Sequence, residues 1–250
     1  MNRPVLLPMP DINILILAAG KLPQQNANRE YPLCLTEVGS GSLLEKIVNN
    51  TKLIENAQLA FAFLDHEADR FHLEKIAALL SPSASSTKVS EHTKGSACTA
   101  LLAACQLNQE AELLIISANE LVDIDYNEAI VELRKRRLDA GTLIFQSVHP
   151  RYSFVTLNDE GLVEQTAQRD PISKNATAGI FWFAKTGDFI EGAKNLIRND
   201  AHLDGNYFVA LTFNELILNQ KRIGVIQLDS DKYTPLKNGH QIGHYEDGKH

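Results

Sequence analysis

Cysteine is scarce in this sequence, which excludes the classes of protein that depend on it. The three cysteines, Cys34, Cys98 and Cys105, are an odd number and contain no C-x-x-C pair. Disulfide frameworks need paired cysteines, and zinc sites built on cysteine need closely spaced ones. We therefore expect neither, and a reducing, cytoplasmic location fits this cysteine usage best.

Long apolar runs and concentrated positive charge are also lacking. No segment offers the ~18 uninterrupted apolar residues that a membrane span requires, and the first ten residues carry too short an apolar stretch for a signal peptide. The formal net charge is -7, and the one dense basic cluster covers residues 134–137. Because such a surface repels a phosphate backbone, we expect no membrane span and no nucleic-acid partner, and we place the basic cluster at the end of a helix.

The remaining composition is that of an ordinary globular protein. Hydrophobic residues make up 44% of the chain and charged residues 22%, and no repeat or linker divides its 250 residues. A single α/β sheet domain can reach this length. We predict one domain over residues 1–250, with a core over residues 12–228 and a tail over residues 229–250.

Apolar runs alternate with helical patterns in the first half of the chain. The runs at residues 12–18, 59–64 and 113–116 are typical of strands that are buried on both faces of a sheet. Helical patterns are predicted at residues 43–48, 68–80, 97–105 and 127–137. This alternation predicts parallel strands with right-handed crossovers.

The second half has a different pattern. Short strands are predicted at residues 142–148, 153–157 and 162–166, with residues 158–161 as a hairpin turn. Further strands are predicted at residues 178–183 and 223–228, and helices at residues 187–198 and 211–219. The fold class we predict is α/β: a mixed, mostly parallel sheet flanked by helices, with a small antiparallel β region in the second half.

Six short blocks carry the functional signal. The first, LAAG at Leu17-Ala18-Ala19-Gly20, ends the first buried strand, where an open α/β sheet places a nucleotide. The others are YPLCLTEV from Tyr31, TKGSACTALLAA from Thr93, SANELVDID from Ser117, HPRYSFVTLNDEGLV from His149 and DPISKNATAGIFWF from Asp170. Together they resemble the sugar-nucleotidyltransferase (nucleotide-sugar pyrophosphorylase) family, most closely its bacterial capsule and surface-polysaccharide branch, over about residues 12 to 228.

The resemblance implies a Rossmann-like fold of the GT-A type and a reaction. Such proteins transfer a nucleotidyl group from a nucleoside triphosphate to a sugar phosphate or a similar phosphorylated acceptor, with Mg²⁺ as cofactor. It implies nucleotide binding by Leu17, Ala18, Ala19, Gly20, Lys21, Gly95 and Ser96. It implies acceptor binding by Ser153, Arg169, Thr177 and Gly179, catalytic roles for Arg169 and Asp123, and metal binding by Asn119 or Glu120.

Several charged positions of the family pattern are nevertheless replaced. The glycine and the arginine that follow LAAG in the family are absent, so Lys21 and Arg29 are the cations left in that loop. Leu33 stands in place of a lysine, and Asn119 in place of a metal-binding aspartate. Attack on a polyphosphate depends on charge neutralisation, so these losses predict slow or absent catalysis.

Three functions therefore stay open. The first is a divergent nucleotidyltransferase, with Arg169 facing the open cleft and a loop between Gly20 and Tyr31 that is mobile without a ligand. The second is a catalytically degenerate protein that binds a nucleotide or sugar phosphate and regulates or assembles with an active paralogue or a second copy. The third, ranked lower, is a GT-A glycosyltransferase that would use Asp123-Ile124-Asp125 as a D-x-D metal motif. Gly95 and Ser96 could also simply begin a helix, and Ser153, Thr177 and Gly179 could serve close packing.

Overall fold

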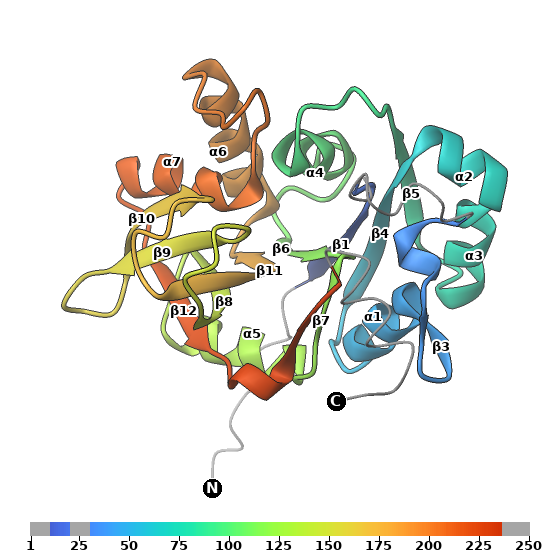
Figure 1. The fold of residues 1–250 in the computed structure, drawn as a ribbon, viewed down its shortest axis with the longest axis horizontal. Helices are drawn as coiled ribbons and strands as arrows, with labels where there is room; N and C mark the ends of the chain where they lie inside the picture. The colour runs from blue at the N-terminus through green and yellow to red at the C-terminus, as the bar shows by residue number, and fades with distance from the viewer. Residues whose placement is uncertain (1–10, 21–30, 237–250) are drawn as a thin grey trace, which may run out of the picture.

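A nine-stranded mixed sheet forms the centre of the computed structural model, which describes residues 11–20 and 31–236 (Figure 1). Seven strands follow one another in the order β10-β9-β11-β6-β1-β4-β5, and β8 and β12 attach beside β11. The predicted class, a mostly parallel sheet flanked by helices with an antiparallel region in the second half, is confirmed.

The parallel half is built around β1 (Ile12–Ala18), whose seven residues are all buried. It pairs in parallel with β4 (Ala57–Leu64) on one side and β6 (Glu112–Ser117) on the other, and β5 (Ser85–Val89) extends the sheet beyond β4. Because these strands run in the same direction, their carboxyl ends meet at one edge of the sheet.

Helices cover both faces of this sheet, as Figure 1 shows. One face packs against α1 (Leu43–Thr51), α2 (Asp65–Phe71), α3 (Leu73–Leu80) and α5 (Tyr126–Lys135), and the other against α4 (Ser96–Ala104), α6 (Thr186–Arg198) and α7 (Thr212–Leu218). The predicted single helix over residues 68–80 is divided, because His72 adopts a left-handed conformation with φ of 54°. No helix in the described ranges is long and apolar enough to cross a membrane.

The antiparallel half contains β8 (Ala140–Gln146), β9 (Ser153–Leu157), β10 (Val163–Gln168) and β11 (Asn175–Phe183). Strand β11 is antiparallel to β6, β8 and β9, so it joins the two halves into one sheet. Strand β12 (Ile223–Gln227) then pairs in parallel with β8. The predicted turn closes the β9–β10 hairpin through Asn158, whose Oδ1 accepts from the amides of Glu160 and Leu162.

Two short β pairs and three single turns of 3₁₀ helix escaped the sequence analysis. The pairs are β2 (Glu37–Val38) with β3 (Gly41–Ser42), and β7 (Glu120–Val122) with β13 (Tyr233–Pro235), and the turns are η2 (Leu33–Leu35), η3 (Val209–Leu211) and η4 (Ser230–Lys232). Strand β13 lies in the segment that we had assigned to a tail, yet Leu236 is fully buried. The packed core therefore continues beyond residue 228.

The basic cluster at the end of α5 serves the fold. Arg134 forms two hydrogen bonds of 2.8 and 2.9 Å with the carboxylate of Glu112, which also accepts from the indole of Trp182 at 2.9 Å. The guanidinium of Arg136 donates to the carbonyl of Val225. These contacts support the structural interpretation of residues 134–137.

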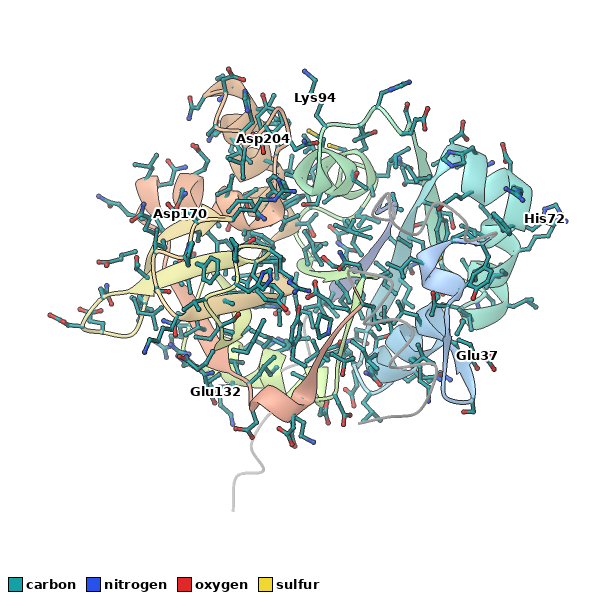
Figure 2. The ribbon with its side chains drawn as sticks, viewed as in Figure 1. Glu37, His72, Lys94, Glu132, Asp170 and Asp204 are labelled. Carbon is teal, nitrogen blue, oxygen red and sulfur yellow. The ribbon has the colours of Figure 1, made fainter. Side chains whose placement is uncertain are left out.

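Charged side chains otherwise lie mainly at the surface. In Figure 2, Glu37, His72, Lys94 and Glu132 lie at the outline of the molecule, and all four are exposed. The interior is filled by aliphatic and aromatic side chains from both halves of the sheet.

Candidate functional site

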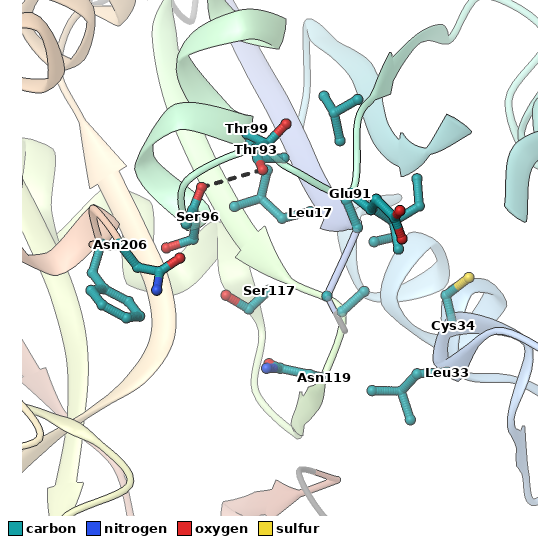
Figure 3. Close-up of a pocket in the computed structure, with 18 of the residues that line it drawn as sticks. Leu17, Leu33, Cys34, Glu91, Thr93, Ser96, Thr99, Ser117, Asn119 and Asn206 are labelled. Carbon is teal, nitrogen blue, oxygen red and sulfur yellow. Dashed lines mark hydrogen bonds between the residues drawn. The ribbon is translucent and has the colours of Figure 1, made fainter. Parts of the chain in front are cut away.

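A cavity of about 510 Å³ lies at the carboxyl edge of the parallel strands (Figure 3). Its floor includes Leu17 and Ala18 at the end of β1, which lead into Ala19 and Gly20. Ser117 at the end of β6 and the next two residues, Ala118 and Asn119, extend this floor. This is the edge at which open α/β sheets bind their ligands.

The amino end of α4 forms one wall of the cavity. Gly95 has φ of +89°, and a Cβ atom there would lie 2.3 Å from the carbonyl oxygen of Tyr207, so no other residue fits this contact. The amide of Ala97 donates to the same carbonyl at 3.0 Å, and Ser96 Oγ accepts from the amide of Val209 at 3.2 Å. These contacts dock residues 206–209 onto the start of the helix.

Arg169 also lines the cavity, beside the segment that docks onto the start of α4. This residue lines the same cavity as Gly20 and Asn119, and the direction of its guanidinium toward the cleft stays a prediction. Its guanidinium lies 3.4 Å from the carboxylate of Asp204 and 6.0 Å from the ring centre of Phe208. The side chain keeps 55% of its surface exposed, so it can still turn toward a ligand. Its predicted binding of an acceptor phosphate stays a prediction.

Asn119 presents an unpaired acceptor at the cavity. Its backbone carbonyl accepts from the amide of Leu236 at 3.0 Å, while its side-chain Oδ1 is buried without a hydrogen-bond partner among the described residues. A buried acceptor left unpaired costs about 1–3 kcal/mol. A ligand group that donates to this oxygen would remove that cost.

Glu120 is the next residue, yet its carboxylate lies away from the cavity. Glu120 is only 3% exposed, and Tyr233 Oη donates a hydrogen bond to its Oε2 at 2.5 Å. The other oxygen occupies the space beside Gly179, where an added Cβ would lie only 1.8 Å from it. Burial, followed by the charge of Glu120, raises the pKa of Tyr233 above its ordinary value, so this hydroxyl remains a donor. The structure therefore gives Glu120 and Gly179 packing roles beside β13.

The two aspartates of the D-x-D triplet do not converge on a site. The side chain of Asp123 is 84% exposed and lies 3.7 Å from the ammonium group of Lys232. Asp125 caps α5, because its Oδ1 accepts from the amide of Asn127 at 2.8 Å. Neither residue lines the cavity. The placement supports neither the catalytic role predicted for Asp123 nor the glycosyltransferase alternative.

Ser153 and Thr177 also lie apart from the cavity lining. Ser153 Oγ donates to Gln168 Oε1 at 2.5 Å, across the β9–β10 pair. Thr177 is 3% exposed and pairs with Ile144 of β8. Among the four residues expected to bind an acceptor, Arg169 lines the cavity and the other three occupy packed positions in the sheet.

Several lining residues were missed. Ser90 and Glu91 follow β5, a strand that the sequence analysis did not predict. Asn206 and Phe208 come from the segment held against α4. In the described part of the lining, Glu91 and Arg169 are the charged residues, and their formal charges cancel.

Leu33 and Cys34 enter the cavity from η2. Both are buried, and desolvation, followed by the charge of Glu67, raises the pKa of the Cys34 thiol to about 12. The thiol is therefore protonated at neutral pH and is not activated as a nucleophile. Lys21, Arg29 and the predicted mobile loop lie outside the described residues.

The described residues do not fit a magnesium ion well. Mg²⁺ is usually held by one or two carboxylates together with substrate phosphates. The cavity offers the neutral amide of Asn119 and, from a different wall, Glu91. In residues 11–20 and 31–236 there is no group of three or more His, Cys, Asp or Glu that could hold a metal ion. The predicted metal roles of Asn119 and Glu120 thus have no support from this geometry.

Comparisons with known proteins give matches in structure only. No protein-family model matches this sequence, and no curated protein matches it. A nucleoside-diphosphate-sugar pyrophosphorylase from Vibrio cholerae RC9 superposes with a TM-score of 0.77 at 16% identity, covering 92% of this chain and 98% of that one. A putative glucose-1-phosphate thymidylyltransferase from Bacillus anthracis, in complex with a sucrose, gives 0.73 at 14% identity, covering 94% of each chain.

A third solved structure extends the comparison to a bound nucleotide sugar. A UDP-glucose pyrophosphorylase complexed with UDP-glucose superposes with a TM-score of 0.75 at 14% identity, and the match covers 95% of this chain and 98% of that one. Because all three matches span nearly the full length of both partners, the likeness concerns the whole arrangement of the sheet and its helices.

Proposed function

We propose, for a chain that has the fold of the nucleotide-sugar pyrophosphorylases, that the cavity binds a nucleotide or a nucleotide sugar. One observation carries this proposal: two segments predicted to bind a nucleotide, residues 17–20 and residues 95–96, converge on the same cavity. They are separated by more than seventy residues in the sequence, so only the fold brings them together.

The cavity has the size and the groups that such a ligand needs. Its volume of about 510 Å³ lies within the range of small-molecule sites, which is ~300–1,000 Å³. The lining includes the hydroxyl side chains of Ser96, at the start of α4, and of Ser117, at the end of β6. Phe208 and Arg169 supply an aromatic ring and a cation to the lining.

Binding is favoured over rapid chemistry. In nucleotidyl transfer an acceptor phosphate oxygen forms a bond to the α-phosphorus, the bond from that phosphorus to the bridging oxygen breaks, and pyrophosphate leaves. The departing charge must be neutralised, yet the described lining offers Arg169 opposed by Glu91. We therefore infer a binding protein of surface-polysaccharide biosynthesis whose transfer activity is slow. Association with an active paralogue or a second copy remains a prediction.

Calorimetric titration with a panel of UDP-, dTDP-, CDP-, GDP- and ADP-glucose and the corresponding triphosphates tests this proposal. We expect saturable binding of at least one of them. Replacing Ala19 with phenylalanine should fill the cavity and weaken that binding more than about tenfold, because the added ring occupies the ligand's volume. Leu79→Phe, on the 85%-exposed position of α3, is the matched control and should bind normally.

Two results would reject the proposal. One is the absence of binding across the whole panel by a protein that melts cooperatively. The other is an Ala19→Phe variant with native affinity, which would place the binding site elsewhere.

A further inference from the structure

Asn119 is held firmly at its place on the cavity floor. The amide before it, that of Ala118, donates to the carbonyl of Leu17 at 2.9 Å, and the carbonyl of Asn119 accepts from Leu236 at 3.0 Å. These two bonds tie its main chain to β1 on one side and to the segment after β13 on the other. The main chain of Asn119 is therefore fixed, and its side-chain Oδ1 is buried without a hydrogen-bond partner among the described residues.

Glu120 is restrained from reaching the same point. Its carboxylate accepts from Tyr233 Oη at 2.5 Å, and its backbone pairs with Pro235 in the β7–β13 ladder. The stacking of Tyr233 on Phe145, with ring centres 4.0 Å apart, holds the phenol in position. Turning Glu120 toward the cavity would break a buried hydrogen bond to a charged group, which is worth about 1.5–3 kcal/mol.

The other nearby carboxylates belong to different surroundings. Asp123 projects into solvent, and Glu91 lies on the wall that follows β5, apart from Asn119 in the close-up of Figure 3. In the parts of the chain that the structure describes, Asn119 Oδ1 is thus a neutral acceptor without a neighbouring carboxylate to share a cation. A hard divalent cation gains little from one amide oxygen, whereas a hydroxyl or N–H donor satisfies that oxygen fully.

We propose that the cavity binds a nucleoside diphosphate sugar without a divalent cation, and that Asn119 Oδ1 accepts a hydrogen bond from a hydroxyl or N–H of this ligand. The proposal rests on the function proposed above and specifies the ligand class. A diphosphate sugar carries fewer negative charges than a triphosphate, which suits a described lining whose one cation, Arg169, is opposed by Glu91. It also carries many hydroxyl donors, which a triphosphate lacks on its phosphate chain.

The test titrates the five nucleoside diphosphate glucoses, UDP-glucose first, into the protein with EDTA and again with MgCl₂. We expect the affinity to agree within about twofold between the two conditions. Asn119→Leu, of similar size but without an acceptor, should lose about three- to tenfold in affinity in both, as expected for one hydrogen bond. Asn119→Asp should bind more weakly in EDTA and recover with MgCl₂, because its added charge repels the diphosphate unless a cation lies between them.

Asp123→Asn is the control for a change in the number of carboxylates outside the cavity. Its affinity for the nucleoside diphosphate glucoses should equal that of the native protein in both buffers. Thermal melting shows whether each variant folds, and Asn119→Ala, which also lacks an acceptor, replaces Asn119→Leu if the latter does not. Native binding that requires MgCl₂, or unchanged affinity in Asn119→Leu, would overturn the metal-free proposal. Failure of every sugar nucleotide and triphosphate to bind would instead reject the proposed function itself.

Discussion

Two neighbouring regions of this protein, the nucleotide-side lining and the acidic segment, differ in how their residues act. The nucleotide-side lining comprises residues 17–20 and 95–96, most of which have small side chains or none. The acidic segment comprises residues 120–123, where Glu120 and Asp123 turn away from the cavity toward Tyr233 and Lys232. The position of the nucleotide-side lining follows from where a strand ends and a helix begins, whereas a site formed by carboxylates depends on where each side chain points.

Restoring charged side chains at the cavity should have the largest effect, because it would give the lining the charged groups that it lacks. The double variant Asn119→Asp with Leu33→Lys places a carboxylate and an ammonium in the lining, and electrostatic groups of this kind change rates by ~10²–10³ each. We expect pyrophosphate release, with sugar phosphates and a panel of triphosphates at saturating MgCl₂, to rise above a weak native rate. Each single variant is the control. Robust native turnover that the double variant abolishes would show that these positions belong to a different working site.

The packing of the acidic segment should fail when Gly179 gains a side chain. A Cβ at this position would lie 1.8 Å from Glu120 Oε1, and its φ of +65° already disfavours other residues. We expect Gly179→Ala to lower the free energy of unfolding by about 3 kcal/mol, measured by urea denaturation. Gly161→Ala is the matched control, because Gly161 has φ of +73° but no atom within 4 Å of an added Cβ. Equal losses in the two variants would contradict the close fit of Glu120.

Removing the hydroxyl of Tyr233 should lower the stability of the protein and leave its affinity for a nucleotide sugar unchanged. Tyr233→Phe deletes the donor to the buried carboxylate of Glu120, so the free energy of unfolding should fall by about 2 kcal/mol. Because neither residue lines the cavity, the affinity for the nucleotide sugar that binds best should stay within about twofold. Tyr207→Phe, whose hydroxyl donates to the exposed Asp200, should cost less stability. A large loss of affinity in Tyr233→Phe would place Glu120 in the site after all.

The smallest expected effect concerns Cys34 and alkaline pH. Its folded pKa of about 12 lies above the ordinary thiol value of 9.0, so the folded state keeps a proton that the unfolded state releases. Stability from this group is present below pH ~9 and is lost as the pH rises toward ~12. We expect Cys34→Ala to flatten the decline of the unfolding free energy with pH above ~9. At pH 8, a thiol reagent should label the exposed Cys105 well before Cys34.

Much of the fold could be read from local patterns. The buried run at β1, the helical period of α6 and the hairpin turn at Asn158 each depend on neighbouring residues, and the structure confirms all three. Strand β5 was missed because its sequence, SSTKV, is polar and only its last residue is buried. The pair β7–β13 was missed because it joins residues more than a hundred positions apart, and short strands carry little periodicity of their own.

In the candidate site, too, some features follow from local sequence and others from contacts between distant segments. The sequence by itself determined the α/β class, the strand end at Leu17 to Gly20 and the helix start at Gly95, because strand burial, turns and helix initiation are local properties of the chain. Only the tertiary structure decided which polar groups meet at the cavity. It turned Glu120 toward Tyr233, left Asn119 Oδ1 without a partner among the described residues and brought Phe208 beside Arg169. Side-chain direction is set by contacts between distant segments, and no local pattern records those contacts.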